Sequence, residues 1–161
     1  MKKIQKTNAI RFLDQHKVEY EAHTYEHKDG DPVDGVHVAN MLHQPVEAVY
    51  KTLVTQANTK EYLVYMLPVE KELDLKKCAK IAGVKSCEMI HVKDINKITG
   101  YIRGGCSPLG MKKQFRTFIE MDCLNQDKIY FSAGKIGMQI EMDPKTLMDL
   151  IHVQAGDITK E

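Results

Sequence analysis

Residues 49–69, with the sequence VYKTLVTQANTKEYLVYMLPV, decide the fold of this chain. Both flanks are rich in β-branched and aromatic residues, which favour extended backbone, and the ANTK segment between them is polar. We therefore predict two strands, over residues 49–56 and 61–69, joined by a hairpin turn. Lys51 interrupts the first strand, where most neighbours are apolar or aromatic. Since most lysines are exposed, the residue pattern alone favours a solvent-facing Lys51 over a buried one.

Helix caps and alternating apolar residues predict the elements on both sides of this hairpin. Thr7 or Asn8 can cap the first helix, Asp34 the second, and Asp74 the third, which Gly83 ends. The predicted helices cover residues 6–18, 36–42, 73–83, 92–99 and 144–153, the last starting at Asp143-Pro144. The other predicted strands cover residues 18–25, 115–122, 128–134 and 137–143.

Strict alternation of strands and helices is absent, so the order of elements favours an α+β fold. We expect one mixed, mostly antiparallel β-sheet, partly barrel-like and surrounded by helices. The 161 residues fit a single domain over residues 1–161. The tail at residues 155–161 is expected to be loosely attached.

Composition narrows the class of protein. The formal net charge is +1, without the basic excess typical of proteins that coat nucleic acid. No long apolar run follows the N-terminal lysines, and none reaches the ~20 residues of a membrane span. The four cysteines form no CxxC pair and are interpreted as reduced thiols. We expect a cytoplasmic protein with no membrane partner.

A metal site is not predicted. HTYEH places His23 and His27 four residues apart, but the metalloprotease signature requires Glu directly after the first histidine, where Thr24 stands. A third ligand at a familiar spacing is missing from the sequence around them. We therefore expect neither a metal nor another cofactor.

The stretch TGYIRGGCSPLGMKK, residues 99–113, is the strongest candidate for a ligand site. Glycine permits close approach of the backbone to a ligand, and successive N–H groups in such a loop can bind a phosphate or a developing oxyanion. By itself the stretch fits a bulged turn equally well. For Cys106 we favour a small, apolar-like side chain over a nucleophile, because the sequence places no base beside it.

Five stretches together resemble the YbaK/EbsC family: HTYEH, VYKTLV, LDLKKCAKIAG, TGYIRGGCSPLGMKK and IYFSAGKIGMQIEM, in the family's order and approximate spacing. Members of this family are aminoacyl-tRNA deacylases related to the editing insertion domain of bacterial prolyl-tRNA synthetase. The resemblance implies a trans-editing enzyme that clears mischarged Cys-tRNA(Pro). It also implies, as partners, the aminoacylated 3′ end of tRNA(Pro) and, transiently, prolyl-tRNA synthetase.

The resemblance also assigns site residues. It implies catalytic roles for Lys51, Gly104 and Gly105, with the Gly104, Gly105 and Cys106 N–H groups facing the oxyanion. The implied substrate-binding residues are Tyr25, Thr52, Cys106, Ser107, Pro108, Ser132 and Gln139. Family members often carry Asp at the position of Gln139. An amide there can still form hydrogen bonds to a substrate amine or ribose.

The mechanism implied is substrate-assisted ester cleavage, because the residues suggest no protein nucleophile or general base. The attacking group is then the substrate thiol, a ribose hydroxyl or water, with release as in a hydrolase or a lyase. Two alternatives remain open at this stage. One is a deacylase for another mischarged tRNA, such as Ala- or Ser-tRNA, and the other is a non-catalytic module that binds a nucleotide or acyl ligand.

Overall fold

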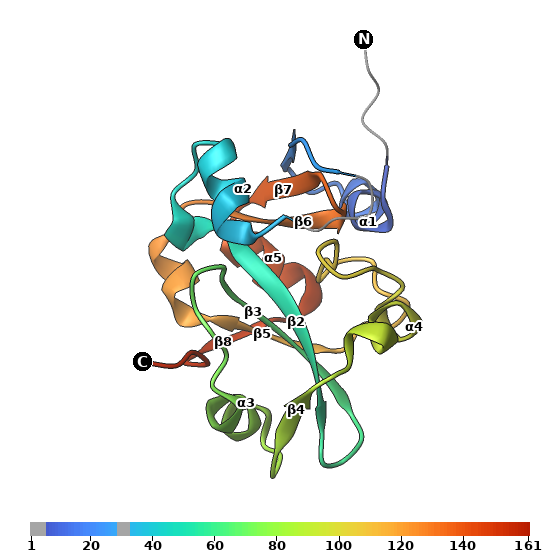
Figure 1. Cartoon of the computed structure of the whole chain (residues 1–161), viewed down its shortest axis with the longest axis vertical. Helices are drawn as coiled ribbons and strands as arrows, with labels where there is room; N and C mark the ends of the chain where they lie inside the picture. Colours follow the sequence, from blue (N-terminus) through green and yellow to red (C-terminus); the bar gives the residue numbers. More distant parts are fainter. Residues whose placement is uncertain (1–5, 29–32) are drawn as a thin grey trace.

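The computed structural model describes residues 6–28 and 33–161. The predicted hairpin is present as β2 (Tyr50–Ala57) and β3 (Tyr62–Pro68), which pair antiparallel from Tyr50↔Pro68 to Gln56↔Tyr62. This hairpin forms the centre of a five-stranded sheet with the order β4-β2-β3-β5-β8 (Figure 1). Its other strands are β4 (Cys87–Met89), β5 (Arg116–Glu120) and β8 (Gln154–Gly156).

A second sheet lies beyond the upper end of β2 in Figure 1. It has three antiparallel strands in the order β1-β7-β6, with β1 (Glu21–Thr24), β6 (Ile129–Lys135) and β7 (Met138–Met142). An isolated bridge between Val49 and Tyr130 connects the two sheets. The α+β class and the mostly antiparallel pairing are confirmed, but the described strands form two sheets rather than one and do not close into a barrel.

Four of the five described helices begin where the predicted caps stand, the exception being the helix that starts at Ile95. The Thr7 hydroxyl accepts the N–H of Ile10, and the Asp34, Asp74 and Asp143 carboxylates cap in the same way. Gly83 ends its helix in the left-handed conformation, with φ 71°. The helices are α1 (Asn8–Gln15), α2 (Gly35–Met41), α3 (Leu75–Ala82), α4 (Ile95–Thr99) and α5 (Pro144–Ile151). Short 3₁₀ segments cover Val46–Ala48, Val92–Asp94 and Met121–Asn125. No helix in the described part of the chain is long and apolar enough to cross a membrane.

Two clusters of buried apolar side chains pack the helices against the two sheets. The first joins the three-stranded sheet to α1 and α5 through residues such as Leu13, Phe131 and Leu147. The second lies between the five-stranded sheet and α3, and includes Tyr65 and Phe118, whose rings stack at 5.2 Å. Each fully buried side chain of this size contributes about 1.5–3 kcal/mol. The candidate site described below lies at the end of β2 that adjoins the first cluster.

The C-terminal tail differs from the sequence-based expectation of a loosely attached segment. Residues 154–156 form β8 parallel to β5, and Ile158 is fully buried in the second cluster. The Ile158 carbonyl accepts the N–H of Asp74 at 2.9 Å, and its own N–H donates to the Glu120 carboxylate at 2.9 Å. The prediction was wrong because the pattern of so short a segment does not reveal that an open edge of β5 will accept it.

Candidate active site

A cavity of about 530 Å³ lies between the N-terminal end of β2, the start of α2, the glycine-rich loop and the β6–β7 hairpin. Its walls bring together residues that are far apart in sequence, including Lys51 and Gly104. The predicted site residues that line it are Tyr25, Lys51, Thr52, Gly104, Cys106, Ser132 and Gln139. The volume falls in the ordinary range for small-molecule sites.

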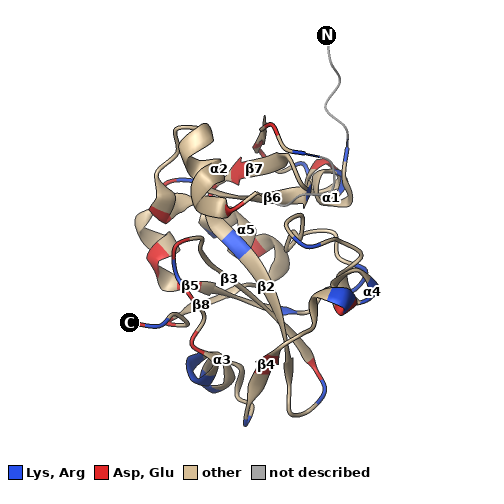
Figure 2. Ribbon diagram, viewed as in Figure 1, with Lys and Arg blue, Asp and Glu red and all other residues tan. Residues whose placement is uncertain are grey.

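Lys51 extends from β2 into this cavity and is half-buried. Burial lowers the pKa of Lys51 below the ordinary lysine value, while the nearby carboxylates of Glu72 and Asp34 act in the opposite direction. Its ammonium donates to the Val69 carbonyl at a long 3.4 Å. Figure 2 shows the basic segment of β2 next to α2; Lys51 is the only Lys or Arg of that strand. A partly desolvated ammonium with one weak partner is suited to bind an anionic oxygen.

Two residues of the glycine-rich loop that line the cavity, Gly104 and Cys106, have backbone N–H groups without an acceptor among the described residues. Gly104 has φ 81°, a conformation that favours glycine. Gly105 differs, because its N–H donates to the Ile102 carbonyl at 2.9 Å within the loop itself. The expected row of three oxyanion donors therefore has its middle member engaged elsewhere.

Three predicted residues do not line the cavity. Gly105, Ser107 and Pro108 are buried. A Cβ on Gly105 would lie 2.9 Å from the Lys135 Cα, so glycine here lets the loop pack against the β6–β7 turn. Ser107 Oγ accepts the Leu109 N–H at 3.4 Å. The structure thus gives Gly105 and Ser107 contacts within the protein. The catalytic role of Gly105 and the substrate-binding roles of Ser107 and Pro108 stay predictions.

Cys106 lines the cavity but is poorly suited to nucleophilic attack. Burial raises the pKa of its thiol to about 12. The thiol is therefore protonated near neutral pH, whereas the thiolate is the reactive species. The described cavity walls contain no histidine, and their one carboxylate, Asp34, accepts the Val36 N–H at 2.7 Å as a helix cap. A protein nucleophile with its own base is not assembled there.

The side of the cavity formed by β6 and β7 is polar. Ser132 and Gln139 are directly opposite each other on these strands. Gln139 is only 4% exposed, and its Oε1 accepts a hydrogen bond from Gln44 Nε2 at 2.7 Å. Ser132 Oγ accepts the Gly134 N–H at 3.1 Å. Because both side-chain oxygens already accept, the Gln139 amide nitrogen and the Ser132 hydroxyl are left as donors for a ligand.

Sequence reasoning missed several residues of this site. Arg103 and Asp34 line the cavity, and Gln44 orients Gln139 through the hydrogen bond from its Nε2. The available signal for Arg103 was its position directly before the glycine pair. Among the described wall residues, Lys51 and Arg103 against Asp34 give a charge of +1, which favours an anionic ligand. Apolar residues complete the walls: Val33, Val38, Val49, Leu53, Val69, Phe131 and Met138.

A family model and a sequence relative that match this chain both concern aminoacyl-tRNA. The family model for the aminoacyl-tRNA editing domain matches residues 33–150. EbsC of Enterococcus faecalis, named as a candidate Cys-tRNA(Pro)/Cys-tRNA(Cys) deacylase, is 45% identical over 155 residues, covering 96% of this chain and 94% of that protein.

Solved structures share the fold at low sequence identity. A candidate trans-editing enzyme for prolyl tRNA synthetase superimposes with a TM-score of 0.84 at 17% identity, covering 96% of each chain. A hypothetical protein superimposes with a TM-score of 0.85 at 17% identity, covering 96% of this chain and 100% of that one. At such identities these matches establish the fold alone.

Proposed function

Because the chain belongs to the YbaK/EbsC family of aminoacyl-tRNA editing domains, we propose that it is a trans-editing deacylase that clears cysteine from mischarged Cys-tRNA(Pro). The observation that carries this proposal is the convergence of Lys51 and Gly104 on one cavity. Each residue alone had a plain structural interpretation, a solvent-facing lysine or a turn glycine. Their convergence favours a binding site built around an oxygen that carries negative charge.

The reaction is cleavage of the ester between the amino acid and the terminal ribose of the tRNA. Attack on the ester carbonyl places negative charge on its oxygen, and the Gly104 and Cys106 N–H groups provide donors for that oxyanion. Preorganised donors of this kind typically contribute about 100–1000-fold in rate each. Lys51 binds the oxyanion or the phosphate of the terminal nucleotide rather than the substrate ammonium, since like charges repel.

The attacking group comes from the substrate or from water. The raised pKa of Cys106 and the absence of histidine from the described cavity walls argue against a protein nucleophile. If the substrate thiol attacks, a new C–S bond forms as the ester C–O bond breaks, and the ribose oxygen takes the proton. Holding the thiol against the carbonyl can supply about 7–11 kcal/mol of the barrier. A substrate-assisted route also selects cysteine without a large recognition pocket.

The remaining polar groups fix the ends of the substrate. Tyr25, Thr52, Ser132 and Gln139 line the cavity, and we assign them to the ribose hydroxyls and the aminoacyl amine. The small net charge of the chain favours recognition of the aminoacylated 3′ end over grip on the whole tRNA. Transient association with prolyl-tRNA synthetase would then supply selection of tRNA(Pro).

A side-by-side deacylation assay tests the proposal. Purified protein is mixed with Cys-tRNA(Pro), Cys-tRNA(Cys), Ala-tRNA(Pro), Ser-tRNA(Pro) and Pro-tRNA(Pro), and release of the amino acid is followed. We expect fast release from both cysteinyl-tRNAs and slow release from the others. Equal rates for Ala-tRNA(Pro) would favour the rival deacylase, and no release from any substrate would favour the non-catalytic binding module.

A further inference from the structure

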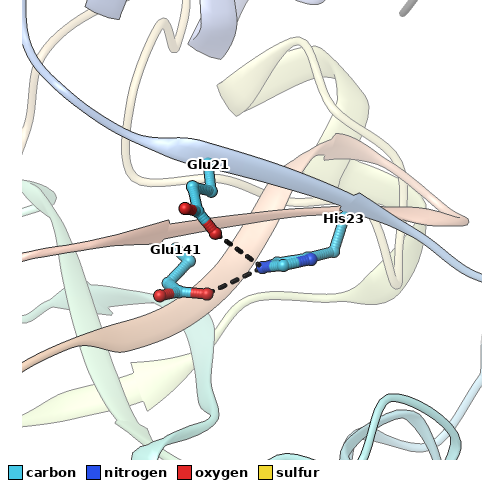
Figure 3. A group of neighbouring side chains, drawn as sticks. All are labelled: Glu21, His23 and Glu141. Atoms are coloured by element: carbon cyan, nitrogen blue, oxygen red, sulfur yellow. Dashed lines mark hydrogen bonds and ion pairs between the residues drawn. The ribbon is translucent and has the colours of Figure 1, made fainter.

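A cluster of three potential metal ligands lies on the three-stranded sheet, outside the cavity walls. Glu21 and His23 come from β1 and Glu141 comes from β7, and their side chains point toward one another (Figure 3). His23 Nε2 lies 2.8 Å from Glu141 Oε1 and 4.0 Å from Glu21 Oε2. One ligand atom from each residue fits within a group in which all distances are below 4.8 Å.

The strand register gives this cluster an electrostatic reason to bind a cation. Glu21 and Glu141 are directly opposite each other on neighbouring antiparallel strands, where two like charges destabilise the pair. Tyr130 is opposite Glu141 on the other side. Both carboxylates also lie near the same imidazole nitrogen, His23 Nε2, so His23 is the partner that they share.

The ligand types and spacing favour a transition metal over Mg²⁺ or Ca²⁺. Imidazole nitrogen suits Zn²⁺ and its neighbours, whereas the hard cations require mostly oxygen ligands. Tetrahedral Zn²⁺ with bonds of about 2.0–2.2 Å holds its ligand atoms roughly 3.3–3.6 Å apart. The present separations of 2.8 and 4.0 Å lie on either side of that value. The 74% exposed Glu21 side chain has room to close the longer one.

We propose that Glu21, His23 and Glu141 form a binding site for one divalent transition-metal ion, with Zn²⁺ the best match. Three protein ligands leave a coordination position for water. The ion would cross-link β1 to β7 beside the cavity, because His23 is directly opposite Gln139 and β1 leads into Tyr25. The sequence-based expectation of no metal considered ligands near His23 in the chain, whereas Glu141 reaches it across the sheet.

Binding of Zn²⁺ alone tests this site without reference to deacylation. Chelator-treated protein is titrated with ZnCl₂ by calorimetry at neutral pH, with MgCl₂ in a parallel titration. We expect one Zn²⁺ per chain and a raised melting temperature. Glu141→Gln keeps the side-chain shape and should weaken binding by at least about 10-fold. His23→Ala should do the same.

His27→Ala is the matched control, because His27 belongs to the same HTYEH stretch but is exposed and contacts the Lys28 carbonyl at 3.1 Å. It should bind Zn²⁺ as the wild type does. Absence of Zn²⁺ binding, or wild-type affinity in Glu141→Gln, would overturn the proposal, as would equal loss in His27→Ala. Circular dichroism of each variant establishes that it is folded, and Glu141→Gln carries the test if His23→Ala is not.

Discussion

Polar groups along the β2–β3 hairpin differ in whether they have hydrogen-bond partners. At the cavity end, Lys51 has one weak hydrogen bond, and the buried Thr52 hydroxyl has no partner among the described residues. At the far end, the buried Thr55 hydroxyl donates to the Leu63 carbonyl at 3.2 Å. Midway along β3, opposite Leu53, the Tyr65 hydroxyl donates to the Cys78 carbonyl at 2.8 Å. The same pair of strands thus supplies both incompletely paired and fully paired polar groups.

We interpret this difference as a division between the end proposed to bind the substrate and the end that maintains the fold. Buried polar groups in folded proteins are normally paired, and leaving one unpaired costs about 1–3 kcal/mol. A concentration of unpaired donors around one cavity is therefore expected where a ligand supplies the missing partners. Away from this cavity, the buried Thr55 and Tyr65 hydroxyls already have partners within the protein.

Lys51→Ala is expected to have the largest effect on activity with little effect on stability. Removing the ammonium should lower the rate of Cys-tRNA(Pro) deacylation by at least about 100-fold, because the charge on the reacting oxygen loses its partner. The melting temperature should change little, since the Lys51 hydrogen bond is weak. Lys77→Ala is the control at the tail end, where Lys77 pairs with Asp157 at 3.0 Å. Wild-type turnover by Lys51→Ala would remove Lys51 from the mechanism.

Ile158→Ala should lower the stability of the fold and leave the deacylation rate nearly unchanged. Ile158 is fully buried in the second apolar cluster, so the free energy of unfolding should fall by about 2–5 kcal/mol. Deacylation per folded molecule should remain near wild type at low temperature. Urea denaturation measures the first quantity. Lys160→Ala, which removes an exposed ion pair with Glu72, should cost less than about 1 kcal/mol. Equal stability of both variants would mean that the tail is not anchored as described.

Two glycines with positive φ offer a matched pair of substitutions. Gly83, with φ 71°, ends α3, and a Cβ added to it would meet no atom within 4 Å. Gly104, with φ 81°, lines the cavity. Alanine at either position should destabilise the fold by about 1 kcal/mol through backbone strain. Only Gly104→Ala should also lower the deacylation rate, by about 10-fold or more, because its N–H is reoriented. Similar rates for both variants would contradict the donor role of Gly104.

The pH dependence of the deacylation rate tests whether the positive charge of Lys51 is required. Burial lowers the pKa of Lys51, so the ammonium is lost at a pH below that of an ordinary lysine. After subtraction of spontaneous ester hydrolysis, the rate should therefore fall on the alkaline side, below the pH where a free lysine titrates. Lys51→Arg keeps its charge throughout this range. Its residual activity should lack that alkaline fall, and an unchanged profile would assign the titration to another group.

The smallest effect is expected for Cys106→Ala. The raised pKa of Cys106, about 12, keeps its thiol protonated near neutral pH, and the loop contributes its backbone N–H rather than its sulfur. The variant should retain most of its deacylation rate, within about threefold, in the same assay. An inactive but folded Cys106→Ala protein would require a covalent intermediate on the enzyme.

Local patterns predicted the elements well where the cause is local. The caps at Thr7, Asp74 and Asp143 and the β2–β3 hairpin depend on a few neighbouring residues, and the structure has them where the sequence placed them. The attachment of the tail and the division of the strands into two sheets depend on partners far along the chain. The predictions of a loosely attached tail and of a single sheet were therefore wrong. The site shows the same division. Lys51 and Gly104 came from motif resemblance, whereas Arg103, Asp34 and Gln44 emerged only from packing.

The sequence by itself determined the α+β class, the main hairpin, the helix ends and the family to which the chain belongs. These features follow from backbone preferences and motifs that act over a few residues. Only the tertiary structure decided which groups are left unpaired, because pairing depends on contacts between distant segments. It engaged the Gly105 N–H inside its own loop, oriented Gln139 through Gln44, and brought Glu141 against Glu21 and His23. Hydrogen bonds and electrostatic interactions act over a few ångströms, so their partners are fixed only when the sheets close on each other.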